Sequence, residues 1–106
     1  MRDLEKCVRE CMQELSSIGI TCGNITRLEV NSRAIRRWGQ CTTIVYDKQW
    51  EKRQYEISIS VVLLDERNPE SALKDTVIHE LLHSCKNCNG HKGEWKRLAE
   101  KVNREL

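Results

Sequence analysis

The first hydrophobic pattern in the chain is helical. Between about Asp3 and Ile18, apolar side chains recur every three or four residues and, at about 100° per residue, fall on one arc: Leu4, Cys7, Val8, Cys11, Met12, Leu15 and Ile18. Asp3 is suited to cap the start of a helix, and Gly19 is suited to end it. The pattern predicts an amphipathic helix, with Cys7 and Cys11 as small core residues rather than metal ligands.

Three strand-like stretches follow this helix. The first two run from Ile25 to Asn31 and from Trp38 to Tyr46. The third, from Tyr55 to Leu64, is the clearest, because alternate positions are apolar: Ile57, Ile59, Val61 and Leu63. The polar residues 47–54 between the last two stretches predict a hairpin loop.

The pattern becomes helical again after Asn68. Asn68 is a good N-cap and Pro69 suits a first helical position, so we predict a helix that runs to about Ser84. A last helix from about Gly93 has one apolar face: Trp95, Leu98, Ala99, Val102 and Leu106. The order helix, three strands, two helices predicts an α+β fold with a three-stranded, mostly antiparallel sheet in a single domain of residues 1–106.

The helix that ends near Ser84 contains the most informative motif. His79, Glu80 and His83 belong to the segment HELLH, and His91 is the only other histidine of the chain. On a helix the two motif histidines lie one turn and about 40° apart, so both can reach one metal ion, while the glutamate flanks it. Hydrolytic zinc sites usually have three protein ligands and keep a fourth position for water. We therefore predict His79, His83 and His91 as zinc ligands and Glu80 as the catalytic residue.

Nearby residues leave other ligand sets open. Glu94 could take the place of His91, because some zinc peptidases use a glutamate from a second helix. Cys85 and Cys88 form the only C-x-x-C pair, which is also a zinc-ligand spacing. Together with His83 and His91 they could close a four-ligand structural site. Alternatively, the two cysteines shape the loop or form a reversible disulfide.

Composition limits the class of protein and the cellular compartment that we expect. The chain has 106 residues, of which 39% are hydrophobic and 32% charged, as is typical of a globular protein with one modest core. It has no apolar run long enough for a membrane span and no apolar stretch of a signal peptide, so we expect a cytoplasmic protein without membrane association. The six cysteines are then expected to be thiols or metal ligands.

Net charge is only +2, which does not indicate an obligate polyanion binder. Charge is nevertheless uneven. Basic residues exceed acidic ones after Lys86, and four arginines surround Glu29: Arg27, Arg33, Arg36 and Arg37. Either stretch could contact phosphate, although a solvated surface is the simpler interpretation.

The motif resembles that of the SprT-like metallopeptidase family, which includes the Spartan-type proteases of DNA–protein crosslink repair. The resemblance rests on HELLH, on Gly90 with His91, and on Trp95, and more weakly on the Arg37–Gly39 region and the third strand. It covers most of residues 37–103. It does not include the C-terminal zinc ribbon with paired C-x-x-C motifs that many relatives carry, so autonomous DNA binding is not expected from it.

This resemblance implies a minimal zincin-like core that binds zinc through the three histidines, with Glu80 as general base. It also implies cleavage of proteins, often DNA-associated ones, with the substrate added as a strand along an exposed sheet edge. We expect a monomer that acts on flexible protein or peptide substrates. A non-enzymatic, zinc-stabilised nucleic-acid-binding or regulatory module is the alternative, and a hydrolase for non-peptide amides would use the same site.

The sequence leaves the oxyanion-stabilising residue open, because no histidine remains for that role. Tyr46, Tyr55 and Arg37 are the candidates. The three tryptophans have separate expected positions: Trp38 in the core, Trp95 under the zinc loop, and Trp50 exposed in the hairpin loop, where it could stack on bases.

Overall fold

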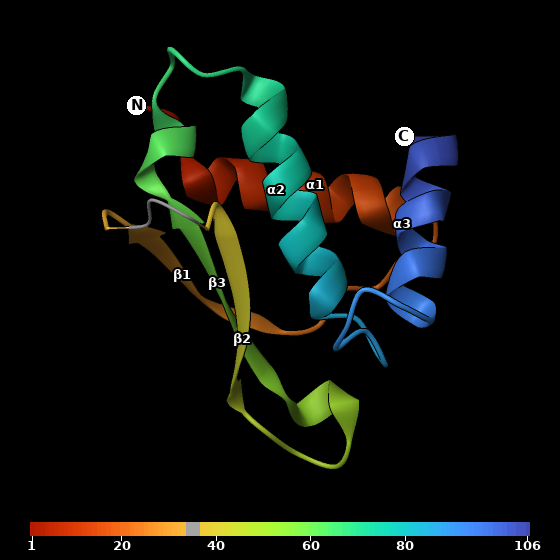
Figure 1. The fold of residues 1–106 in the computed structure, drawn as a ribbon. Coiled ribbons are helices and arrows are strands. Elements are labelled where there is room, and N and C mark those ends of the chain that lie inside the picture. Colours follow the sequence, from red (N-terminus) through yellow and green to blue (C-terminus); the bar gives the residue numbers. More distant parts are fainter. Residues whose placement is uncertain (34–36) are drawn as a thin grey trace.

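The structure is a computed structural model that describes residues 1–33 and 37–106 (Figure 1). Its helices and strands are, in order, α1 (Leu4–Ser17), β1 (Ile25–Asn31), β2 (Gly39–Val45), β3 (Gln54–Ser60), α2 (Glu70–His83) and α3 (Glu94–Glu105). Two short 3₁₀ helices, η1 (Trp50–Lys52) and η2 (Val61–Leu64), flank β3. This arrangement confirms the predicted α+β class and element order. Within the described residues, no helix is long and apolar enough to cross a membrane.

The three strands form one mixed sheet. Its order is β1-β3-β2, so β3 is the central strand. β2 and β3 pair antiparallel, which confirms the hairpin predicted for residues 47–54, whereas β1 and β3 pair parallel. Both outer strands, β1 and β2, therefore have one edge free of strand partners among the described residues.

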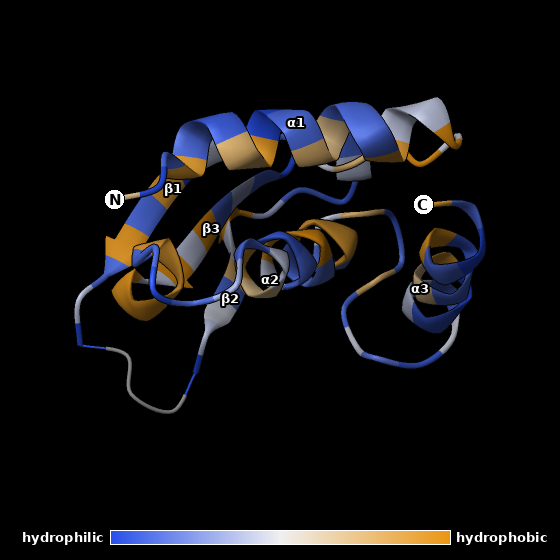
Figure 2. Ribbon diagram, turned by 90° about the horizontal axis from the view of Figure 1, so that it is seen from above, coloured by the Kyte–Doolittle hydropathy of each residue, from blue (hydrophilic) through white to orange (hydrophobic). Residues whose placement is uncertain are grey.

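The core lies between one face of the sheet and the helices α1 and α2 (Figure 1). Each of these elements contributes fully or almost fully buried side chains, among them Cys11, Leu15, Ile57, Ile59, Leu73, Val77 and Leu81. The apolar side of α1 is turned toward α2, as Figure 2 shows. Cys11 is thus a core residue, and Cys7 is partly buried against the same core, as predicted.

Both ends of α1 have the capping residues that the sequence predicts. The Asp3 carboxylate accepts a hydrogen bond from the backbone N–H of Lys6 at 3.1 Å. Gly19 follows the helix with a φ of +81°, a left-handed conformation that glycine adopts without strain. Both predicted helix signals are confirmed.

The predicted third strand was too long. β3 ends at Ser60, and the next four residues form η2, in which Leu63 and Leu64 are both buried. Two consecutive side chains of a strand point to opposite faces, so a 3₁₀ turn is the way to bury both on one side. The Ser60 hydroxyl accepts a hydrogen bond from the Val62 N–H and starts this turn.

Three further predictions were wrong. Asn68 does not cap α2; Pro69 is the N-cap, and the Asn68 side chain donates to the Val62 carbonyl at 2.7 Å. Trp38 is 54% exposed rather than in the core. Its neighbour Gly39 faces α2, and adjacent residues of an extended segment point to opposite sides. Trp50 is half-buried, because its indole N–H donates to the Ser84 carbonyl at 2.9 Å.

Candidate metal centre

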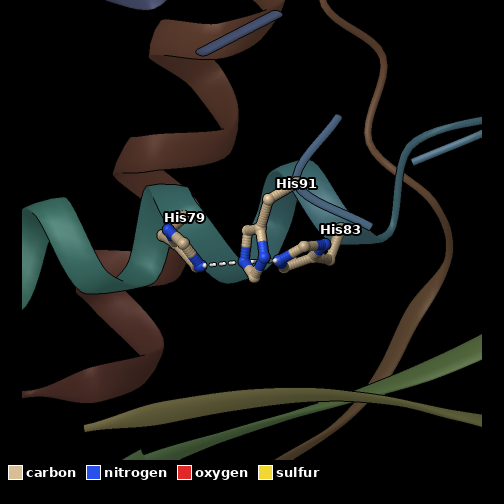
Figure 3. Close-up of side chains that lie close together, drawn as sticks. All are labelled: His79, His83 and His91. Carbon is tan, nitrogen blue, oxygen red and sulfur yellow. Dashed lines mark hydrogen bonds between the residues drawn. The ribbon is translucent and has the colours of Figure 1, made fainter. Parts of the chain in front are cut away.

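Helix α2 and the loop after it bring the three histidines together. His79 and His83 lie one turn apart near the end of α2, and His91 reaches back from the loop before α3 (Figure 3). The Nε2 atom of His91 is 3.1 Å from that of His79 and 3.0 Å from that of His83. Within the part of the chain that the structure describes, these residues form the one group that could hold a metal ion, with ligand atoms within 4.8 Å of one another.

Hydrogen bonding defines which nitrogen of His83 is available. Its Nδ1 atom lies 3.0 Å from the carbonyl oxygen of Cys88. A carbonyl oxygen can only accept, so Nδ1 carries the proton and Nε2 presents its lone pair to the other two rings. A metal ligand held through its second nitrogen in this way has a defined tautomer and orientation.

The His79 ring is also suited to the neutral, ligating form. Burial lowers the pKa of His79, and the neighbouring His83 and His91 lower it further. Three closely spaced imidazole nitrogens cannot all satisfy one another through hydrogen bonds. A cation between them would remove this conflict, so the donor set fits a metal ion.

Trp95, in the first turn of α3, lies against all three rings. Its ring centroid is 4.9 Å from that of His79 and 4.8 Å from that of His91, and it stacks on His83 at 5.3 Å and 18°. The indole N–H also donates to the His79 carbonyl at 3.4 Å. The predicted position of Trp95 under the loop is confirmed, and the indole limits how far each imidazole can rotate.

Replacing Trp95 with alanine should therefore weaken metal binding. We expect an increase of about 10–100-fold in the dissociation constant of zinc, the usual effect of removing a group that orients metal ligands. Competition with a chromophoric chelator measures this constant. Trp38→Ala is the matched control, because it removes an exposed indole that, among the described residues, makes none of the ring contacts with the histidines that Trp95 makes. An unchanged zinc affinity in Trp95→Ala would show that the loop alone orients the rings.

Glu80 lies beside the cluster, on the side of α2 that faces β2. It is only 7% exposed, and its Oε2 atom is 3.9 Å from Nε2 of His79. Burial raises the pKa of Glu80, while His91, Arg37 and a hydrogen bond from the backbone N–H of Cys41 oppose this shift. The carboxylate thus lies near the clustered histidines without being one of the grouped residues.

Gly39 has a role that sequence reasoning missed. A Cβ atom at this position would lie 2.8 Å from the Thr76 side chain and 3.0 Å from Cγ of Glu80. Only glycine lets the start of β2 approach α2 this closely. The available signal was a glycine at the beginning of a β-rich segment, which often marks a close approach of two backbones.

The cluster opens into a cleft of about 580 Å³ between α2 and β2. Its lining residues are Arg37, Gly39, Gln40, Cys41, Thr43, Tyr55, His79, Glu80, His83, Asn89 and His91. A second hollow of about 540 Å³ lies between α1 and β1, but none of the clustered histidines lines it. The two hollows have similar volumes, so the histidine cluster, and not the size of the hollow, identifies the candidate site.

The alternative ligands are engaged elsewhere. The Glu94 carboxylate binds the Arg97 guanidinium at 2.6 and 2.7 Å. The Cys85 thiol contacts the Leu81 carbonyl and the Cys22 thiol, and the Cys88 thiol contacts the Lys86 carbonyl. Among the described residues, no cysteine groups with the histidines as a possible ligand.

The arginines that surround Glu29 in the sequence have different surroundings in the structure. Arg27, on β1, pairs with Glu56 of β3 at 3.0 Å, and Arg37 lines the cleft. Arg36 lies outside the described residues.

Comparison with protein-family models gives one finding. The model of the SprT-like family matches residues 8–106. This range includes the three histidines, Glu80 and Trp95. Comparisons with curated proteins and with solved structures found no match.

Proposed function

The chain belongs to the SprT-like family, and we propose that residues 1–106 are a single metallopeptidase domain that hydrolyses peptide bonds with zinc. The convergence of three imidazole nitrogens beside a buried glutamate carries this proposal. Three neutral imidazoles are a common donor set for catalytic zinc. When bound, zinc would make a water molecule more acidic and polarise the carbonyl group of the substrate.

His79, His83 and His91 would hold the metal ion. The Cys88 carbonyl keeps Nδ1 of His83 protonated, and Trp95 packs against the rings. Both contacts orient the ligands before the metal binds, which reduces the reorganisation that binding requires.

Glu80 would act as the general base. Its carboxylate takes a proton from the attacking water and passes it to the nitrogen of the leaving amine. Burial, which raises the pKa of this carboxyl group, makes it a stronger base than an exposed glutamate. The backbone N–H of Cys41 donates a hydrogen bond to it from β2.

The free edge of β2 would bind the substrate. The Ser60 N–H donates to the Trp38 carbonyl, so Trp38, Gln40 and Thr42 turn their backbone groups toward β3. The intervening Gly39, Cys41 and Thr43 turn theirs toward the open edge, where the Cys41 N–H already donates to Glu80, and all three line the cleft. An extended polypeptide could pair with this edge as an additional strand. This geometry favours flexible or unfolded proteins; preference for DNA-associated proteins stays a prediction from the resemblance.

Metal dependence tests the proposal. We expect the purified chain to bind one zinc ion and to cleave an unfolded protein such as casein. Chelation of the metal should abolish cleavage, and stoichiometric zinc should restore it. Gel electrophoresis and elemental analysis measure the two properties separately. A chain that binds zinc tightly but cleaves neither casein nor peptides would instead support a zinc-stabilised module.

Cobalt substitution tests the ligand set. Histidine ligation predicts d–d absorption without strong thiolate-to-cobalt charge transfer, and a shift of the d–d bands when a hydroxamate is added. A strong charge-transfer band would show that Cys85 or Cys88 binds the metal and would contradict the proposed site.

A further inference from the structure

Peptide hydrolysis places negative charge on the carbonyl oxygen of the scissile bond. Hydrogen-bond donors aimed at this oxygen are often the largest single contribution to catalysis. The three histidines are committed as ligands in the proposed function, so a donor must come from another residue of the cleft. We propose that Tyr55 is this catalytic residue and that its hydroxyl donates to the carbonyl oxygen of the substrate. This inference rests on the proposed function.

The Tyr55 ring is held in place on several sides. The residue is 2% exposed and belongs to the central strand β3, where it pairs with Thr43 of β2. Gly23 packs so closely on the ring that a Cβ atom there would lie 2.7 Å from Cε2 and 2.9 Å from Cδ2. Gly23 is in turn bound to the end of α2, because its N–H donates to the Ser84 hydroxyl at 2.9 Å. The ring therefore needs little reorganisation during a reaction.

The hydroxyl of Tyr55 is available for a ligand. Across the described residues, the Tyr55 side chain makes no hydrogen bond within the protein. Its hydroxyl is not among the buried polar atoms that lack a partner, so it is accessible to solvent although the residue as a whole is 2% exposed. Because Tyr55 also lines the cleft with the metal-site residues, a bound substrate is the partner that would satisfy this donor.

The position of Tyr55 complements that of Glu80. Glu80 contacts the backbone of Cys41, whereas Tyr55 pairs with Thr43, two residues further along the same strand. Two residues of a strand span about 6–7 Å, roughly the length of one substrate residue and its flanking peptide groups. Glu80, as the base, and Tyr55, as the donor, would therefore lie at opposite ends of the cleft, on either side of one scissile bond.

The other candidates fit this role less well. Tyr46 is 71% exposed, and its ring lies under the Arg53 guanidinium at 4.7 Å rather than in the cleft. Arg37 lines the cleft near Glu80, where its charge lowers the pKa of that carboxyl group. It is thus placed beside the base, not at the opposite end.

Tyr55→Phe tests the proposal, because phenylalanine keeps the ring and removes the hydroxyl alone. We expect kcat for a fluorogenic peptide substrate to fall by about 10²–10³-fold, the usual effect of removing one such donor, with little change in KM. Zinc affinity and the thermal unfolding midpoint should stay at their wild-type values. Tyr46→Phe is the matched control and should leave kcat unchanged.

Four outcomes would overturn the role of Tyr55. An unchanged kcat in Tyr55→Phe would exclude it directly. Loss of zinc or of thermal stability along with activity would make it a structural residue. A loss of kcat in Arg37→Gln, with Tyr55→Phe unaffected, would assign the donor to Arg37. Finally, a wild-type chain that binds zinc and cleaves nothing would overturn the proposed function as well, whereas cleavage that disappears in Glu80→Gln supports that function independently of Tyr55.

Discussion

Replacing Glu80 with glutamine is expected to lower kcat/KM for protein substrates by roughly 10²–10⁴-fold, the range that general acid–base catalysis contributes. Glutamine has nearly the same shape but cannot take a proton from water. Cleavage of a fluorogenic peptide, measured beside zinc content, checks this result. Activity retained at the wild-type level in Glu80→Gln would exclude Glu80 as the base.

The same substitution should leave the fold and the metal site intact. Glu80 is 7% exposed, so the wild-type protein bears the cost of desolvating a carboxylate. The amide oxygen of glutamine can still accept the hydrogen bond from the Cys41 N–H. We therefore expect the unfolding free energy to stay constant or to rise.

Glu94→Gln provides the matched control for Glu80→Gln. Glu94 is a second carboxylate close to His91 in sequence, but it pairs with Arg97 and does not join the histidine cluster. Its substitution should change neither zinc content nor kcat/KM. A loss of zinc in Glu94→Gln would revive the alternative ligand set with Glu94 in place of His91.

The histidine cluster was predictable because its geometry is mostly local. His79, Glu80 and His83 occupy one helix, and helical periodicity alone sets their relative directions. His91 follows after a short loop, so chain connectivity keeps it within reach. The fold class was predictable for a similar reason, since each element has its own hydrophobic period.

The rest of the site depends on contacts between segments far apart in sequence. The Cys41 N–H that holds Glu80, the close approach at Gly39 and the position of Tyr55 all follow from how β2 and β3 pack against α2. No pattern within a single segment encodes these contacts. The exposed position of Trp38 has the same origin: its hydrophobicity favoured the core, but the side facing α2 is taken by Gly39.

Gly23→Ala is expected to cause the largest loss of stability, about 3 kcal/mol of unfolding free energy. Gly23 does not have a left-handed φ, so glycine is required there by space alone. A Cβ atom would lie 2.4 Å from the Ser84 carbonyl oxygen and press into the Tyr55 ring. Moving Ser84 away would also lengthen the hydrogen bond from the Gly23 N–H to its hydroxyl.

Urea denaturation measures this loss, and Gly90→Ala is the control. A Cβ atom at Gly90 meets nothing within 4 Å, and its φ is not left-handed, so alanine there should change stability by less than about 1 kcal/mol. Equal stabilities of the two variants would contradict the close packing at Gly23.

Gly23→Ala should also affect the proposed metal site, although the residues nearest to a Cβ atom at Gly23, Ser84 and Tyr55, are not proposed ligands. Ser84 directly follows His83, and its carbonyl also accepts the hydrogen bond from the Trp50 indole. A shift of Ser84 would therefore move the end of α2 and misalign His83 with the other two imidazoles. We expect a higher dissociation constant for zinc in the folded Gly23→Ala variant. Unchanged zinc affinity, together with lower stability, would show that the loop carrying Cys88 and His91 follows the movement of α2.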